Sequence, residues 1–387
     1  MARRFTVIYA VALLLLLSGT AFSAADPIKI GHSVSLTGSA SIWGQSEENA
    51  LDMLVKKING EGGILGRPIE IVRYDNRADA IESVNVARRL AGDGVVAVIG
   101  PAQSGNAIAT APVLERAEIP MIVSTATNPY VTVDQRTEKV RPYAFRPCFI
   151  DSFQGTVAAN FAYDRLGARK AAVLYDVGSD YGQWLTTYFE EAFTARGGAV
   201  AAKEAFRSEE LDYRAQLGKI KELAPDVLFI PTSQKEAAMA AKQARDLGIT
   251  AILLGGDNWG SPDLIDLGGE AVDGSYFVNL ADLSDPDIQG FVREYRELHG
   301  ADPVLPNPIM AQDALIMIAE AAKAAGSVEG TKLAEALANL KNIKVASGTL
   351  TVNPVDHNPL NKPAIIQKVD VAKKEFAFVE KYQSGGE

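Results

Sequence analysis

The sequence predicts an α/β protein built from two doubly wound parallel-sheet lobes. Short apolar runs of strand length alternate with longer helical patterns from residue 27 to residue 255, which is typical of βαβ units around a parallel sheet. The alternation starts again near residue 141, and 387 residues are enough for two domains of ordinary size. The last third brings three helical patterns and a late hairpin, which fits a chain that crosses back between the lobes at a hinge.

The first lobe is predicted from regular alternation after residue 26. Leu51, Leu54 and Ile58 recur at helical spacing behind Ser46, a residue type that caps helices, while the residues before it, 36–44, are expected to form a loop. The expected strands are 28–35, 69–74, 95–99 and 120–124, and the expected helices are 46–59, 81–91 and 106–116.

The second lobe repeats this rhythm. Its expected strands are 171–175, 199–206, 227–230 and 251–254, and its expected helices are 152–166, 182–196, 212–223 and 236–247. The late helices are 288–299, 311–325 and 331–338, and the late hairpin pairs 364–370 with 375–381. If the late helices join the first lobe and the late strands the second, the lobes are 26–146 plus 279–354 and 147–278 plus 355–387.

Composition and the N-terminus indicate an exported globular protein. The chain is 47% hydrophobic and carries 48 acidic against 38 basic residues, so its net charge of −10 argues against nucleic acid or anionic lipid as a partner. Two arginines and the apolar run Val7–Leu17 precede small residues, which predicts a signal peptide over 1–25 that is cleaved near residues 23–25. Cys148 is the only cysteine, so no internal disulfide can form, and we expect a buried thiol.

Two turns at the ends of neighbouring strands form the candidate site in the first lobe. After the strand 95–99, the loop residues Ala102 and Gln103 lead to Ser104, which opens a helix whose first N–H groups suit an anion such as a carboxylate. The next strand ends in the turn Thr125-Ala126-Thr127. Carboxyl ends of parallel strands share one edge of a sheet, so we expect these turns to lie side by side, although the hydroxyls could also serve ordinary turn chemistry.

The second lobe offers complementary groups at its own strand ends. Tyr181 lies between a strand and a helix, and Asp257 follows a strand in the sequence Gly-Gly-Asp-Asn-Trp. Donors for a carboxylate in one lobe, with an acid and an aromatic side chain in the other, suit a zwitterion held between the lobes. The three histidines are scattered, and neither a nucleophile elbow nor a phosphate-binding loop is present, so we expect no catalytic residues, no metal and no cofactor.

A set of short motifs in a specific order covers essentially the whole mature chain. They are Ile30-Gly31-His32-Ser33 with Leu36-Thr37-Gly38, Ile58-Asn59 with Gly62-Gly63-Ile64-Leu65-Gly66, Val98-Ile99-Gly100-Pro101, Ala126-Thr127-Asn128-Pro129, Asp180-Tyr181-Gly182 and Gln243-Ala244-Arg245-Asp246-Leu247-Gly248. By these motifs the chain resembles the periplasmic solute-binding proteins of branched-chain amino acid ABC importers, the leucine/isoleucine/valine-binding type. The resemblance implies the type I periplasmic binding protein fold and a monomer that delivers its ligand to membrane permease subunits.

The resemblance also implies roles for individual residues. Ser104 would hold the ligand carboxylate with Thr127 as its partner, and backbone groups at Thr125 would contact both ends of an amino acid. Tyr181 would close over the ligand, and Asp257 would pair with its α-ammonium group.

The side-chain pocket is where the chain departs from the family pattern. The resemblance makes Trp43 an aromatic wall of that pocket. Ser233 stands near the place where leucine binders carry a tyrosine, and together with Ala102 it would enlarge the cavity, which leaves the identity of the ligand's side chain open. The resemblance itself implies a small amino acid, aliphatic or branched-chain, as the ligand.

Three alternatives stay open at this point. The same fold could bind an amide, a urea-like molecule or an aromatic acid, or it could act as a ligand sensor. A protein of a different class, an exported α/β hydrolase, would need a nucleophile–base pair that the sequence does not display.

Overall fold

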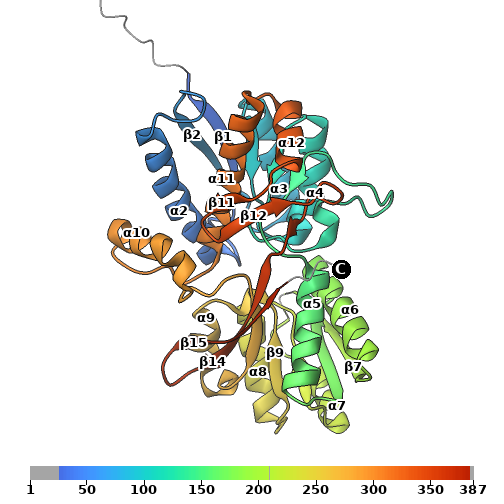
Figure 1. Cartoon of the computed structure of the whole chain (residues 1–387). Coiled ribbons are helices and arrows are strands. Elements are labelled where there is room, and N and C mark those ends of the chain that lie inside the picture. Colours follow the sequence, from blue (N-terminus) through green and yellow to red (C-terminus); the bar gives the residue numbers. More distant parts are fainter. Residues whose placement is uncertain (1–25, 209, 384–387) are drawn as a thin grey trace, which may run out of the picture.

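The computed structural model describes residues 26–208 and 210–383, and these form two α/β lobes, one above the other in Figure 1. The predicted signal peptide, residues 1–25, lies outside the described residues. Within the described ranges, no helix has both the length and the apolar character that crossing a membrane requires.

The upper lobe is built on a five-stranded parallel sheet. Its strands are β1 (Ile28–Val34), β2 (Ile69–Asp75), β3 (Ala97–Ile99), β4 (Met121–Ile122) and β5 (Ala144–Phe145), and its early helices are α2 (Ser41–Gly60), α3 (Ala80–Gly92) and α4 (Ser104–Arg116). The strand order is β2-β1-β3-β4-β5 with all pairs parallel. The order reverses between β1 and β3, and sheets of this type bind ligands beside the carboxyl ends of the strands at that point.

The lower lobe repeats this plan and extends it. It contains β6 (Lys170–Asp176), β7 (Ala199–Phe206), β8 (Val227–Phe229), β9 (Ile252–Gly255), β10 (Tyr276–Asn279), β14 (Pro363–Asp370) and β15 (Glu375–Gln383), with α5 (Asp151–Asn160), α6 (Asp180–Ala195), α7 (Arg214–Leu223), α8 (Gln234–Asp246) and α9 (Asp263–Gly268). The order is β15-β14-β10-β9-β8-β6-β7, in which β7 to β10 are parallel and the late hairpin is antiparallel. Its reversal point lies between β6 and β8.

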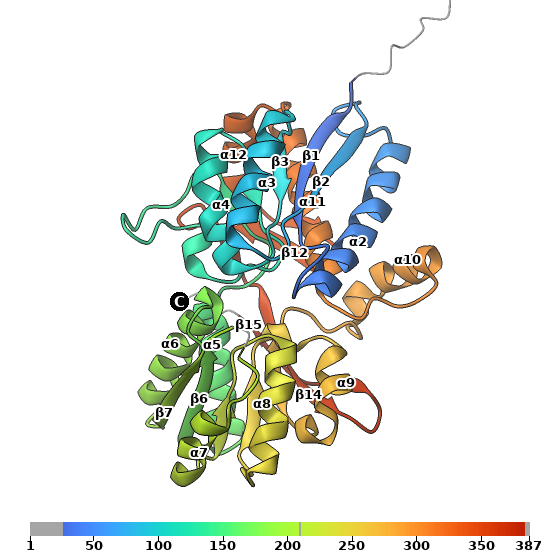
Figure 2. The ribbon, with the colours of Figure 1, turned by 180° about the vertical axis from the view of Figure 1, so that it is seen from behind.

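The last third of the chain contributes to both lobes. It contains α10 (Gln289–His299), α11 (Asn307–Ala325), α12 (Gly330–Ala338) and a small sheet of β11 (Ile343–Val345), β12 (Gly348–Val352) and β13 (Pro359–Leu360). Leu315 and Ile318 of α11 share a buried core with Ile28 and Ile30 of β1, whereas β14 and β15 complete the lower sheet. The chain therefore passes between the sheets after β5, after β10 and before β14 (Figures 1 and 2). The exact lobe boundaries stay a prediction.

A buried ion pair anchors the last of these crossings. Lys362, directly before β14, lies 3.3 Å from the carboxylate of Asp313 on α11, and both side chains are buried. Ser347 bonds to both of these side chains. The crossing segment is thus fixed to the upper lobe at one end and enters the lower sheet at the other.

Some sequence-based boundaries were wrong. Helix α2 begins at Ser41, so residues 41–44, expected in a loop, form its first turn. Ser46 does not cap this helix, because its hydroxyl donates within the helix to the carbonyl of Trp43 at 2.7 Å. The N-cap of α4 is Gln103, and Ser104 is the first residue of that helix.

Candidate functional site

The two predicted turns of the upper lobe lie side by side. Ser104 is 5% exposed, and its Oγ accepts a hydrogen bond of 3.3 Å from the backbone amide of Asn128, which follows the second turn. The hydroxyl of Thr125 donates to the carbonyl of Ala102 at 3.4 Å. Glycine is required at position 100, at the start of the first turn, because its φ is +84° and a Cβ there would collide with the backbone of β1.

Other residues predicted in these turns have internal partners. The Gln103 Oε1 accepts from Ser35 at 3.2 Å and from Asn106 at 3.4 Å, so this side chain stays within its own lobe. Ala126 is buried, and its carbonyl accepts a hydrogen bond of 2.7 Å from the Arg146 guanidinium. Both residues thus shape the turns through contacts inside the protein.

A buried polar network inside the upper lobe supports the second turn. Glu47 accepts from Ser124 at 2.6 Å and from Asn307 at 3.2 Å, and it lies 3.3 Å from His32. Asn307 also donates to the Thr125 hydroxyl at 3.5 Å. Helices α2 and α11 therefore hold the second turn through one shared carboxylate.

The lower lobe brings Tyr181 and Asp257 into direct contact. The Tyr181 hydroxyl donates to Asp257 Oδ1 at 2.9 Å, and the Gln154 amide donates to the same oxygen at 2.7 Å. Gly256 leaves room for this contact, because a Cβ there would collide with the tyrosine hydroxyl. Asp257 is 4% exposed; burial raises its pKa to about 6, although the bonds from Gln154 and Tyr181 act in the opposite direction.

A second buried acid beside this pair was missed by the sequence analysis. Asp151 is the first residue of α5 and is fully buried, and its backbone amide donates to the Thr127 carbonyl at 2.9 Å. Burial raises the pKa of Asp151 to about 8, the neighbouring Thr127 hydroxyl acts in the opposite direction, and the nearby Asp257 carboxylate adds to the increase. The sequence signal was an acid at a predicted helix start directly after a crossing segment. The expected helix began one residue too late to draw attention to it.

The remaining two residues that the sequence predicts for the side-chain pocket differ in their surroundings. Trp43 is half-buried in the first turn of α2. Ser233 is the N-cap of α8, and its amide and hydroxyl donate to Glu236 at 3.2 Å and 2.6 Å. The polar atoms of Ser233 are therefore used in a helix cap, which sequence reasoning did not foresee.

The upper and lower groups face one another across the gap between the lobes. Asn128 Nδ2 donates to the Asp180 carbonyl at 3.4 Å, and the rings of Tyr130 and Trp184 meet edge to face with centroids 4.8 Å apart. The N-terminal turns of α4 and α6 also approach each other, because a Cβ on Gly105 would lie 2.9 Å from Asp180 Oδ2. This arrangement offers hydroxyl and amide donors on one side and two buried carboxyl groups on the other.

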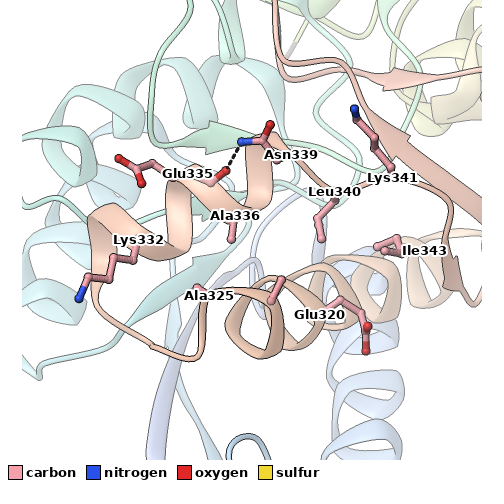
Figure 3. Close-up of a pocket in the computed structure, with 10 residues that line it drawn as sticks. Glu320, Ala325, Lys332, Glu335, Ala336, Asn339, Leu340, Lys341 and Ile343 are labelled. Carbon is pink, nitrogen blue, oxygen red and sulfur yellow. Dashed lines mark hydrogen bonds between the residues drawn. The ribbon is translucent and has the colours of Figure 1, made fainter.

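The rest of the described structure was compared with this site for metal-binding groups and for pockets. No group of three His, Cys, Asp or Glu side chains in the described ranges could hold a metal ion. A surface depression between α11 and α12 is lined by residues such as Glu320, Lys332 and Asn339, whose amide bonds to the Glu335 carbonyl at 2.8 Å (Figure 3). No residue of the candidate site lines this depression.

Comparison with known proteins places the chain in a family. A family model described as periplasmic binding protein matches residues 27–375. The Leu/Ile/Val-binding protein homolog 1 of Brucella suis is 30% identical over 330 residues, which cover 85% of this chain and 87% of the relative. A leucine-binding protein, LivK, from Thermotoga maritima superposes with a TM-score of 0.85 at 32% identity, covering 92% of this chain and 99% of that one.

A structure with a bound ligand is similar as well. The branched-chain amino acid transporter substrate-binding protein LivJ from Streptococcus pneumoniae, in complex with isoleucine, gives a TM-score of 0.83 at 28% identity, with 92% of this chain and 99% of that one covered. The family model, these relatives and the two-lobed architecture agree. The chain belongs to the periplasmic binding protein family.

Proposed function

We propose that this protein is the periplasmic substrate-binding component of an ABC importer and that it holds a small amino acid between its lobes. The observation that carries the proposal is a chain of contacts between the lobes: Asn128 bonds to Ser104 through its amide and to Asp180 through its side chain. The next residue, Tyr181, donates to the buried Asp257. The names of the Leu/Ile/Val-binding relatives support it.

The carboxylate of the ligand would bind in the upper lobe. The first amides of α4 have no partners within the helix and carry partial positive charge, and Ser104 adds a hydroxyl at the same place. Thr127 is 1% exposed and lies beside the Asp151 carboxyl group, and its hydroxyl can donate to an oxygen of the ligand.

The ammonium group would bind in the lower lobe. A buried carboxylate without a counter-charge costs several kcal/mol, and an ammonium group removes this cost. A ligand without the amine leaves Asp257 uncompensated. Selectivity for an amino acid over its keto acid could therefore reach about a thousandfold, since each 1.4 kcal/mol is about a factor of ten.

A small, aliphatic side chain on the ligand fits the rest of the proposal. Trp43 supplies an apolar surface, Ala102 is small, and Ser233 keeps its polar atoms within the helix cap. Amides and aromatic acids would leave Asp257 without its counter-charge, so they fit this site less well. A cytoplasmic sensor would not need the predicted signal peptide.

Closure would couple binding to delivery. Ligand groups bound by both lobes are engaged together only when the lobes are closed, so the ligand shifts the population toward the closed form. Permease subunits in the membrane would then recognise this form. We expect the protein to act as a monomer in the periplasm.

Nothing in the site favours hydrolysis. Ser124, Glu47 and His32, which are residue types found in hydrolase sites, are grouped in the upper lobe and are all buried. The Ser124 hydroxyl donates to Glu47 and not to His32, so the histidine is not placed to activate it. This grouping supports the second turn instead.

A thermal-shift screen of the exported, purified protein tests the proposal. The panel contains the twenty amino acids, their keto acids, short amides and aromatic acids. At a hundredfold excess over Kd, a ligand adds about 2.7 kcal/mol to the free energy of unfolding. We expect a shift with aliphatic amino acids and none with their keto acids. Shifts only with compounds that lack an amine, or turnover of any compound, would overturn the proposal.

A further inference from the structure

We propose that Glu47 is a positioning residue for ligand binding: from inside the upper lobe, its carboxylate orients the hydroxyl and amide groups that hold the two turns of the site, so the affinity for the ligand depends on it. The inference rests on the proposed function, because it names the residue that arranges one half of that site. It gives a buried acid on helix α2 a part in ligand binding.

Helix α2 brings Glu47 to the edge of the sheet where the turns begin. The first turn of this helix lies directly against the end of β1, because a Cβ on Gly44 would collide with the carbonyl oxygen of Ser35. Further along the helix, Glu47 is 1% exposed, and its Oε2 lies 3.3 Å from Nε2 of His32 on β1. His32 is paired with Ile99, the last residue of β3. The carboxylate is therefore fixed beside the strand end from which the first turn leaves.

Two donors share one oxygen of Glu47. Its Oε1 accepts from the hydroxyl of Ser124, directly before the second turn, at 2.6 Å, and from Nδ2 of Asn307 at 3.2 Å. Asn307 is the first residue of α11, and all three side chains are buried. Because a carboxylate oxygen only accepts, both donors must point a hydrogen at Glu47. The acid thus fixes the direction of the Ser124 hydroxyl and of the Asn307 amide.

The orientation of Asn307 is passed on to both turns. Its Nδ2 also donates to the Thr125 Oγ1 at 3.5 Å, and the Thr125 hydroxyl donates in turn to the carbonyl of Ala102 at 3.4 Å. Ala102 lies in the first turn, two residues before Ser104. Bonds of this length are weak, so they keep their direction only while the groups at their ends are held. Glu47 is the fixed end of this chain of hydrogen bonds.

Loss of the acceptor would release the chain. The Ser124 hydroxyl would lose its partner, and a buried donor without a partner is costly. The Asn307 amide would then be free to turn its oxygen toward Thr125, which would draw the Thr125 hydroxyl away from Ala102. The turns would keep their backbone, but their groups would no longer be arranged before the ligand arrives. Groups that are already arranged bind more tightly, because less ordering accompanies binding.

Titration calorimetry with L-leucine on the exported, purified protein tests this with two substitutions at one position. Glu47→Ala removes the acceptor, and we expect the Kd to rise by at least about fivefold, the equivalent of one hydrogen bond of ordinary net strength. Glu47→Gln keeps an oxygen for Ser124 and Asn307. It should recover most of the lost affinity, because these two donors need an acceptor and not a charge.

A matched control on the same helix separates binding from folding. The side chain of Asn59 donates to the carbonyl of Ile69 at 3.0 Å and accepts from its amide at 2.7 Å, about 18 Å along α2 from Glu47. Asn59→Ala and Glu47→Ala should both lower the melting temperature, but only Glu47→Ala should raise the Kd. If Glu47→Ala does not fold, Ser124→Ala deletes a single hydroxyl of the network and should raise the Kd by about 2- to 10-fold.

The outcomes distinguish the two proposals. If the wild-type protein binds no amino acid, the proposed function fails. If it binds leucine, three results would overturn only this inference: an unchanged Kd for Glu47→Ala or for its substitute Ser124→Ala, a Kd for Glu47→Gln as high as that for Glu47→Ala, or an equal rise in Kd for Asn59→Ala.

Discussion

Replacing Asp257 by asparagine should have opposite effects on stability and on binding. The pKa of an aspartate side chain is 3.8 in model compounds, and burial raises the pKa of Asp257 to about 6. At about 1.4 kcal/mol per pH unit, keeping this acid ionised at pH 8 costs the ligand-free protein about 3 kcal/mol. Asparagine keeps an oxygen that accepts from Gln154 and Tyr181 and carries no charge. We therefore expect Asp257→Asn to raise the melting temperature of the ligand-free protein at pH 8.

The sign of this effect depends on pH. A raised pKa means that the contribution of Asp257 to stability is complete below pH 3.8 and is lost as the pH rises through about 6. The stabilisation by Asp257→Asn should accordingly be small at pH 4 and fully present at pH 8. Thermal melts at these two pH values measure it.

Binding should change in the other direction. Removing one partner of a buried charge pair costs about 2–5 kcal/mol, which corresponds to between about 30-fold and about 4,000-fold in Kd. Titration calorimetry with L-leucine should show this loss, and the keto acid should bind no more weakly than before. A lower melting temperature at pH 8, or an equal loss for both ligands, would refute the assignment of Asp257 to the ammonium group.

Four further results are expected. Ser104→Ala should weaken L-leucine and its keto acid alike, by about 3- to 10-fold, with little change in melting temperature; a collapse of the fold would show that the serine is structural. Gly256→Ala should disturb the Tyr181 hydroxyl and weaken leucine binding in calorimetry, while the circular dichroism spectrum stays native. Trp184→Ala removes the contact with Tyr130 across the lobes and should reduce affinity for both ligands by about threefold, with a more open ligand-bound form in small-angle scattering. The rise in melting temperature caused by leucine should grow from pH 5 to pH 8, because the ligand-free protein loses the contribution of Asp257 to its stability as this acid ionises, and the ammonium group restores it.

The fold could be predicted because its main signals are local. Strands such as β1 and β6 are short apolar runs between turn residues, and α8 and α11 have clear helical patterns. Strand β10 escaped notice, since four residues between irregular segments carry little periodicity and are defined by pairing with β9 and β14. The start of α2 at Ser41 was missed because Ser46 looks like a cap but bonds within the helix.

In the candidate site too, residues with a local sequence signal could be predicted and those defined by distant contacts could not. Ser104, Thr127, Tyr181 and Asp257 could be proposed because each follows the end of a parallel strand, where sheets of this kind hold ligands. Asp151 could not, because it follows no long strand and its importance comes from neighbours that are distant in the sequence. Those contacts exist only once the lobes are assembled.

The repeated passage of the chain between the lobes also bears on how the protein folds. The upper sheet lacks the cover of α11 and α12, and the lower sheet lacks β14 and β15, until the last third of the chain is available. A nascent chain that has emerged only as far as residue 300 can close neither core. Newly synthesised protein should therefore remain loosely structured until its end is released, a state suited to passage through a membrane pore that admits only unfolded chains, and both lobes should acquire their stability at nearly the same moment.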